Sequence, residues 1–213
     1  MSNLLTIIFI GNLLLSSPQI RQPVGSPWVA QKSQVVLAEQ KLDLTILGRG
    51  QAATDILADN IRLNLHYFKG DAKEAKDLRE PFTFSFTLEP GEIFAYHDQV
   101  LAEFKNAVIK TQPSHFSNAD GYKTLTLPGS GVCYLASLVN WAASDAGLKV
   151  VALANHDFET IPGVPRKYGT AIYFDGATEI SRRQNLYVVN NLEKPVTFNF
   201  EVTEKDVVVT VTD

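Results

Sequence analysis

Apolar and polar positions alternate in several short stretches of the chain, a pattern that predicts β-strands. Phe82, Phe84 and Phe86 alternate with threonine and serine, and Leu42 to Ile46 alternates in the same way. Further predicted strands span residues 149–153, 170–174, 185–189, 196–202 and 207–211. We expect the stretches 185–189 and 196–202 to pair across an intervening turn, and 207–211 to close the sheet.

Two longer segments repeat apolar residues at three- and four-residue intervals, which predicts helices over 52–68 and 132–146. In the second helix the apolar stripe is Leu135, Leu138, Val139, Ala142 and Ala146, and a polar stripe is Cys133, Ser137, Asn140 and Ser144. Gly147 is expected to end this helix. The charged stretch 69–80 predicts a solvated loop or a short exposed helix. The predicted class is α+β, with a mostly antiparallel sheet packed against two main helices.

The N-terminal segment suggests export. Residues 4–15 are almost wholly apolar, and twelve helical residues cover about 18 Å, short of the ~30 Å hydrocarbon core of a bilayer. That length is typical of a signal peptide, although no lysine or arginine precedes Leu4. A buried strand of a cytosolic protein is the alternative. We therefore predict a signal or membrane-anchor segment and linker over 1–31, a single domain over 32–213, and an extracytoplasmic location.

The composition of the chain excludes several classes of site and partner. The 213-residue chain carries 19 basic and 23 acidic residues, a net charge of −4, with no basic run that indicates nucleic-acid binding. Its single cysteine, Cys133, excludes an intrachain disulfide framework and a multi-cysteine metal site. No group of His, Asp and Glu has metal-ligand spacing, so we predict neither a metal nor another cofactor.

Cys133 lies in the first turn of the predicted second helix, two residues after Gly131. Unpaired N–H groups and the helix dipole favour a thiolate there, and the thiolate is the nucleophile. His156, after the following strand, is the candidate general base, with Asp157 or Asn155 to orient it. The backbone N–H groups of 131–133 are candidates for holding an oxyanion. The alternative is a structural thiol, because free cysteines are often buried as small hydrophobes.

The ordered motifs resemble those of the VanW domain family. The segment Gly129-Ser130-Gly131-Val132-Cys133 resembles the family's glycine-rich cysteine motif, and Pro90-Gly91-Glu92-Ile93-Phe94 its Pro-Gly-Glu-x-Phe segment. Further similar segments are Gly121-Tyr122, Ala146-Gly147-Leu148, Asn155-His156 and Asn190-Asn191 with Pro195. The resemblance extends over roughly 55–211. It departs from the family at Ser130, usually glycine, at Tyr134, usually glutamine, and at Ala95, usually serine.

The resemblance implies an exported cell-envelope protein of a family named after glycopeptide (vancomycin) resistance. Some VanW-domain proteins are regarded as L,D-transpeptidases, which join peptidoglycan stem peptides through a cysteine acyl-enzyme. Carried over by position, Cys133 is then the nucleophile and His156 the base. The family's Gly-x-Asp-Ala stretch is missing from residues 167–171, which leaves Asp157 or Asp175 as the third residue.

The expected partners are peptidoglycan stem peptides, with a possible membrane tether through the N-terminal segment. The residues expected to contact the substrate are Ser130, Gly131, Tyr134, Tyr96 and Tyr168. Two other functions stay open for the same cleft. One is a non-catalytic module that binds peptidoglycan or another envelope partner, and the other is a cysteine peptidase.

Overall fold

The computed structural model describes residues 34–111, 116–125, 130–174 and 176–213. Gln34–Asp213 forms one compact unit. The predicted signal or anchor segment, residues 1–31, lies outside the described residues. Among the helices that the structure describes, none combines the length and the apolar character needed to cross a membrane.

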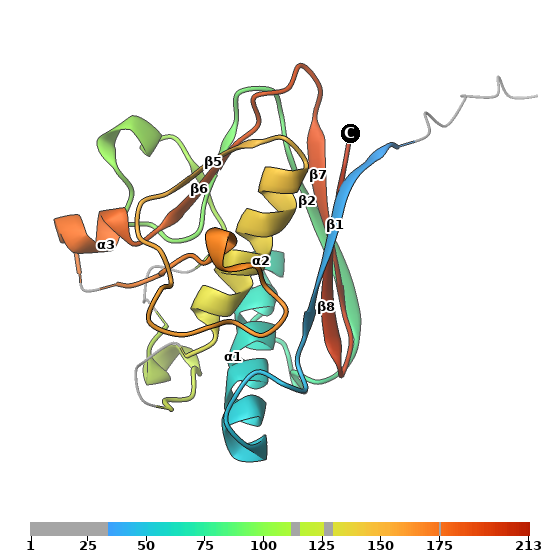
Figure 1. The fold of residues 1–213 in the computed structure, drawn as a ribbon, viewed down its shortest axis with the longest axis vertical. Helices are drawn as coiled ribbons and strands as arrows, with labels where there is room; N and C mark the ends of the chain where they lie inside the picture. Colours follow the sequence, from blue (N-terminus) through green and yellow to red (C-terminus); the bar gives the residue numbers. More distant parts are fainter. Residues whose placement is uncertain (1–33, 112–115, 126–129, 175) are drawn as a thin grey trace, which may run out of the picture. The chain divides into compact units, whose positions relative to one another are not determined.

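Two four-stranded sheets form the framework (Figure 1). The first has the order β1-β8-β7-β2 and is antiparallel throughout. Its strands are β1 (Val36–Asp43), β8 (Asp206–Thr212), β7 (Val196–Val202) and β2 (Phe82–Leu88). The second has the order β4-β3-β6-β5, in which only β3 and β4 run parallel. Its strands are β4 (Val108–Ile109), β3 (Ile93–Ala95), β6 (Leu186–Val189) and β5 (Lys149–Ala152).

The alternating phenylalanines of β2 point into the core, as their spacing predicts. Phe84 is opposite Phe200 and Phe86 is opposite Phe198 across the β2–β7 ladder. Their rings stack with centroids 4.6 and 5.0 Å apart, respectively. Side chains on one face of a sheet meet in this way because successive residues point to opposite faces. The intervening threonines and serine of β2 are exposed.

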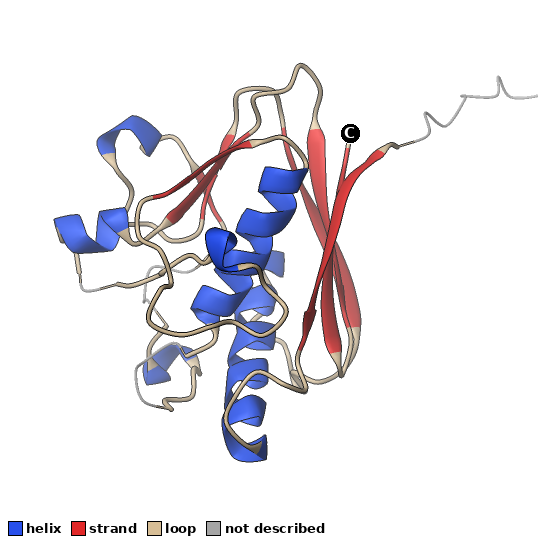
Figure 2. Ribbon diagram, in the orientation of Figure 1, coloured by secondary structure: helices blue, strands red, loops and turns tan. Residues whose placement is uncertain are grey.

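Among the described residues, the α-helices that accompany the sheets (Figure 2) are α1 (Gln51–Lys69), α2 (Val132–Asp145) and the short α3 (Glu179–Arg183). The two long helices confirm the sequence-based prediction to within one residue at each end. Short 3₁₀ helices span Ala102–Phe104, Asn118–Asp120 and Arg166–Tyr168. Helix α2 packs on β1 and β8 of the first sheet and on β5 and β6 of the second. Its predicted apolar stripe is buried, and the α+β class is confirmed.

The predicted pairing of 185–189 with 196–202 is wrong. The stretch 185–189 forms β6 of the second sheet, whereas 196–202 forms β7 of the first. The crossing is fixed by Asn190, whose fully buried side-chain amide donates to the carbonyls of Leu88 and Lys194, both at 2.8 Å. These bonds tie the end of β6 to the end of β2. The predicted closing strand, 207–211, lies within β8. This strand is inside the first sheet, between β1 and β7, and β1 is at the edge.

Two other predicted strands differ from the structure. Strand β1 ends at Asp43, because the Asp43 carboxylate accepts the backbone N–H of Thr45 at 2.8 Å and turns the chain. Ile46 is consequently 54% exposed. Residues 170–174 form no strand. They run in irregular conformation beside α2. Side chains of α2 accept the N–H groups of Thr170 and Ile172, and the backbone carbonyls of Ala154 and Gln184 accept those of Ala171 and Tyr173.

Candidate functional site

Gly131 sets the start of α2 and thereby the position of Cys133. Its φ of 105° lies in the left-handed region that favours glycine, and its carbonyl accepts the N–H groups of Tyr134 and Leu135 at 3.0 and 3.2 Å. A Cβ atom at this position would lie 2.7 Å from the carbonyl oxygen of Leu57 on α1. The absence of a side chain thus lets the start of α2 lie directly against α1.

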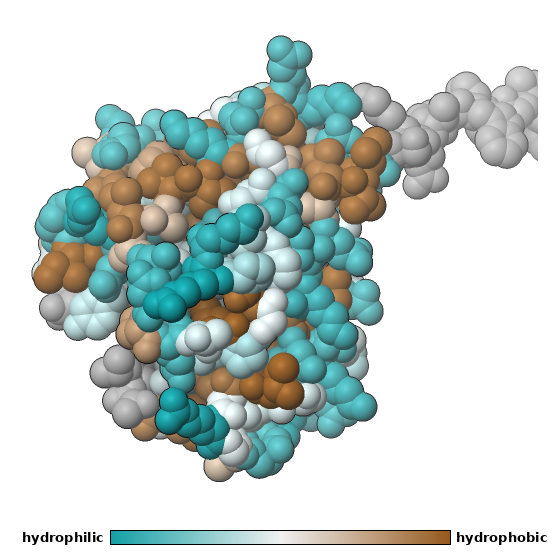
Figure 3. All heavy atoms as spheres, viewed as in Figure 1, coloured by the Kyte–Doolittle hydropathy of each residue, from teal (hydrophilic) through white to brown (hydrophobic). Residues whose placement is uncertain are grey.

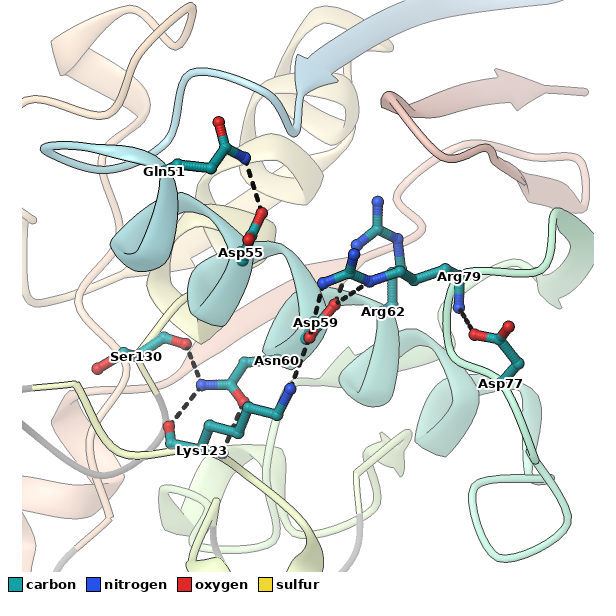
Figure 4. A network of polar contacts seen from close by, with 9 residues as sticks. All are labelled: Gln51, Asp55, Asp59, Asn60, Arg62, Asp77, Arg79, Lys123 and Ser130. Carbon is teal, nitrogen blue, oxygen red and sulfur yellow. Dashed lines mark hydrogen bonds and ion pairs between the residues drawn. The ribbon is translucent and has the colours of Figure 1, made fainter.

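Polar side chains of α1 hold the segments around this helix start (Figure 4). The side-chain amide of Asn60 donates to the carbonyls of Lys123 and Ser130 at 2.7 Å each, and its oxygen accepts the N–H of Lys123 at 2.8 Å. Only 1% of Asn60 is exposed. One buried amide therefore satisfies three backbone groups that precede α2: the carbonyl and the N–H of Lys123 and the carbonyl of Ser130.

One turn further along α1, Asn64 extends this support to the helix itself. It accepts the hydroxyl of Tyr96 at 2.5 Å, and that hydroxyl also lies 3.1 Å from the carbonyl of Val132. Tyr96 is fully buried, so the expectation that it contacts substrate is wrong for this conformation: its hydroxyl is held between α1 and α2. Burial raises the pKa of Tyr96, which keeps the hydroxyl neutral.

The thiol of Cys133 is hydrogen-bonded to the backbone of Ile172. The N–H of Ile172 donates to Sγ at 3.3 Å, and Sγ donates to the carbonyl of Ile172 at 3.5 Å. Burial raises the pKa of Cys133 to about 11, although the N–H of Ile172 acts in the opposite direction. The expected depression at the helix start is therefore absent, because desolvation of the thiolate outweighs the N–H groups. Cys133 is a protonated thiol at neutral pH in this conformation.

Ser137 and Asn140, two more residues of the polar stripe of α2, bind the same segment, residues 168–172, which we call the strap. The hydroxyl of Ser137 accepts the N–H of Thr170 at 2.8 Å. The amide of Asn140 donates to the carbonyl of Tyr168 at 2.9 Å and to the hydroxyl of Thr170 at 3.0 Å. Ser137 and Thr170 are fully buried. The strap is thus hydrogen-bonded to three side chains on one face of α2: Cys133, Ser137 and Asn140.

His156 lies close to Gly169 of the strap and is 4% exposed. Its Nδ1 is 3.0 Å from the carbonyl of Glu159, so Nδ1 carries the proton that it donates to this carbonyl. The ring packs against Tyr134 and Phe158, with centroids 5.8 and 4.0 Å away. A Cβ on Gly169 of the strap would lie 3.3 Å from Cβ of His156. The strap therefore contacts both His156 and Cys133.

Cys133 and His156 are not joined in this conformation: among the hydrogen bonds of the residues that the structure describes, none connects them. Nor does Asp157 orient the histidine, since its exposed carboxylate pairs with Arg166 at 3.3 Å. The other candidate third residue, Asp175, lies outside the described residues. A backbone carbonyl is thus the partner that orients His156.

The remaining predicted substrate-binding residues lie at different distances from the thiol. Tyr134 neighbours Cys133 on α2 and is 4% exposed; burial, and next the charge of Glu159, raise its pKa to about 12. Ser130 precedes the helix and is partly exposed. Tyr168 instead packs on Trp141 and donates to Asp145 at 2.6 Å. Asp145 lies twelve residues after Cys133, about 18 Å along α2, so Tyr168 is remote from the thiol.

No group of His, Cys, Asp and Glu in the described part of the chain has the arrangement of a metal site. Sequence reasoning missed Asn60, Asn64 and Ile172. Asn60 and Asn64 are spaced by four residues on one helix face, and buried asparagine inside a helix needs a specific partner. That spacing was the available signal for them. Ile172 gave none, because it contributes only its backbone.

Gly131→Ala is expected to lower the free energy of unfolding by about 3 kcal/mol or more. The left-handed conformation alone costs a residue with a side chain about 1–2 kcal/mol, and the 2.7 Å approach to Leu57 adds a backbone clash. Gly91→Ala is the matched control, because Gly91 has a φ of 82° and open space around its Cβ position. Urea unfolding of both variants measures the difference, and equal losses would contradict the predicted clash.

Comparison with known proteins agrees with the resemblance noted in the sequence. Residues 84–212, more than half of the chain, match the family described as VanW like protein. This region contains Cys133 and His156 but not α1, which positions the start of α2. Neither a curated protein nor a solved structure matches the chain.

Proposed function

Because the chain belongs to the VanW like protein family, we propose that it acts in the cell envelope as a cysteine acyltransferase on peptidoglycan stem peptides. The observation that carries this proposal is the position of Cys133 in the first turn of α2, within the matched region and one residue from the tyrosine that packs on His156. The apolar segment at residues 4–15 supports export of the chain or its attachment to a membrane.

The proposed reaction has two steps. His156 accepts the thiol proton at Nε2, and the Cys133 thiolate attacks the carbonyl of the third, diamino-acid residue of a tetrapeptide stem. The C–N bond to the terminal D-alanine breaks, His156 returns the proton to the leaving amine, and a thioester remains. A side-chain amine of a second stem then attacks the thioester, forms the cross-linking amide and releases Cys133. The thioester retains the energy of the amide, so no ATP is required.

The surface beside the strap suits a peptide. On the face shown in Figure 3, one of the apolar areas lies over β5 and β6. The exposed large apolar side chains include Leu153 at 46%, Phe158 at 73% and Tyr173 at 45%. All three belong to the segments that flank the strap or pair with it, since the N–H of Ala171 donates to the carbonyl of Ala154 at 2.9 Å. Exposed aromatic rings of this kind supply contact area for a bound peptide.

A second candidate function is a non-catalytic module that binds the same stem peptides. The observation in its favour is the protonated, strap-bound state of Cys133, which is that of a structural thiol. A cysteine peptidase is the third candidate, in which water replaces the acceptor amine.

The test uses the purified protein and disaccharide–tetrapeptide muropeptides, with products analysed by liquid chromatography and intact-protein mass spectrometry. We expect release of D-alanine, a cross-linked dimer, and a mass adduct on Cys133 equal to the stem without its last residue. A shortened monomer without dimer would assign the peptidase. Binding measured by calorimetry, with no D-alanine released, would assign the binding module. Neither turnover nor binding would overturn the proposed substrate class.

A further inference from the structure

We propose that the strap, residues 168–172, is an autoinhibitory cover, and that Cys133 reacts only after the strap leaves the polar stripe of α2. This inference concerns regulation of the site proposed above and rests on that function for its biological meaning. Its physical content, the access of reagents to one thiol, is independent of any substrate.

The backbone of Ile172 lies against the sulfur of Cys133. The Ile172 peptide units face Cys133 with an N–H at 3.3 Å and a carbonyl oxygen at 3.5 Å from Sγ. A carbonyl under attack has to approach the sulfur from open space, and here a backbone carbonyl of the chain itself occupies that place. Cys133 is partly exposed, and the strap occupies the side of Sγ on which Ile172 lies, so its departure widens the approach for a substrate carbonyl.

Side chains of α2, rather than a neighbouring strand, hold the strap in place. Its links to α2 besides Cys133 are the hydrogen bonds with Ser137 and Asn140, a hydrogen bond from Tyr168 to Asp145 at 2.6 Å, and the packing of Tyr168 on Trp141. The strap forms no strand, and one backbone bond, from Ala171 to Ala154 at 2.9 Å, joins it to the chain that follows β5. A segment held by a few side-chain hydrogen bonds opens at lower cost than a strand within a sheet. Release also has to withdraw Ile172, which is 7% exposed and packs in the hydrophobic core.

The strap lies against both the proposed base, His156, and the proposed nucleophile, Cys133. Gly169 of the strap lies against His156, and Ile172, three residues later, lies against Cys133. Since the strap lies against both groups, its departure frees space beside each of them. The high pKa of Cys133, about 11, is due chiefly to burial, so opening is expected to bring it back towards the ordinary value of a thiol.

The test is the rate of Cys133 alkylation by iodoacetamide, followed by mass spectrometry between pH 7 and pH 11. In the wild-type protein we expect labelling at pH 8 about two orders of magnitude slower than for a free thiol, because a pKa near 11 leaves about one thiolate in a thousand. Ser137→Ala and Asn140→Ala each remove bonds to the strap. Each is expected to raise the rate about tenfold and to lower the apparent pKa.

Ser85→Ala is the matched control, since it removes a hydroxyl from an exposed position on β2. Its labelling rate should equal that of the wild type. Urea dependence separates local from global opening. If the strap opens alone, the wild-type rate changes little at low urea, whereas labelling through global unfolding rises with the full slope of the unfolding transition. Global-type dependence, or wild-type rates in both strap variants, would overturn the proposal.

The outcome also separates this inference from the proposed function. Faster labelling of the strap variants, without any dimer from muropeptides, would support the cover and contradict the acyltransferase. Full dimer formation by the wild type, with labelling already fast and unchanged in the variants, would support the acyltransferase and contradict the cover.

Discussion

Cys133→Ala is expected to abolish dimer formation from tetrapeptide muropeptides, with a loss on the order of 10³-fold or more. The chain has no second cysteine to take over the covalent step. In this conformation the thiol is hydrogen-bonded to the backbone of Ile172, and its removal leaves the other side-chain contacts of α2 in place. The measurement is the initial rate of dimer and D-alanine release with equal amounts of folded protein.

Two further variants make this result specific. Cys133→Ser retains the size and hydrogen bonding of the side chain but supplies a far weaker nucleophile, and it should bind muropeptides without turnover. His156→Ala is expected to reduce the rate by about 10²–10⁴-fold, the usual contribution of a general base. Dimer formation by Cys133→Ala at the wild-type rate would show that the thiol has no role in the reaction.

Asp59→Ala is expected to lower the free energy of unfolding by about 3–5 kcal/mol, because it leaves a buried guanidinium without its carboxylate. Arg62 lies 3.4 Å from Asp59, and their side chains are 4% and 7% exposed. Arg79 and Lys123 bind the same carboxylate at 3.1 and 2.6 Å (Figure 4). Asp59 therefore joins α1 to two loops as well as balancing Arg62. Asp55→Ala, one turn earlier on α1, is the matched control and should cost much less.

The pH dependence of this loss has a defined sign. Burial is the largest influence on the pKa of Asp59 and raises it, but the hydrogen bonds and charges of Arg79 and Lys123 together outweigh burial and lower the pKa. A carboxylate with a lowered pKa stabilises the fold fully above the unfolded value of about 3.9 and loses this contribution as the pH falls through the folded value. The difference between wild type and Asp59→Ala should thus shrink below about pH 4. A difference that grows in acid would contradict the assignment.

The local pattern of the chain was sufficient for its main elements and for the family. Three- and four-residue spacing predicted α1 and α2, and alternation at Phe82, Phe84 and Phe86 predicted β2 and the face that it buries. These features depend on residues close in sequence, where the periods of helix and strand apply directly. The glycine–cysteine motif before α2 led to the family by the same local route.

Contacts between residues distant in sequence decided the rest. Asn190 places β6 and β7 in different sheets, although the sequence between them reads as a hairpin turn. The position of Cys133 at a helix start was predictable, but its raised pKa was not, because burial beneath Ile172, 39 residues later, determines it. Periodicity identifies which residues face a core. Only the tertiary structure determines which backbone lies across the thiol, and hence whether that thiol is free to react.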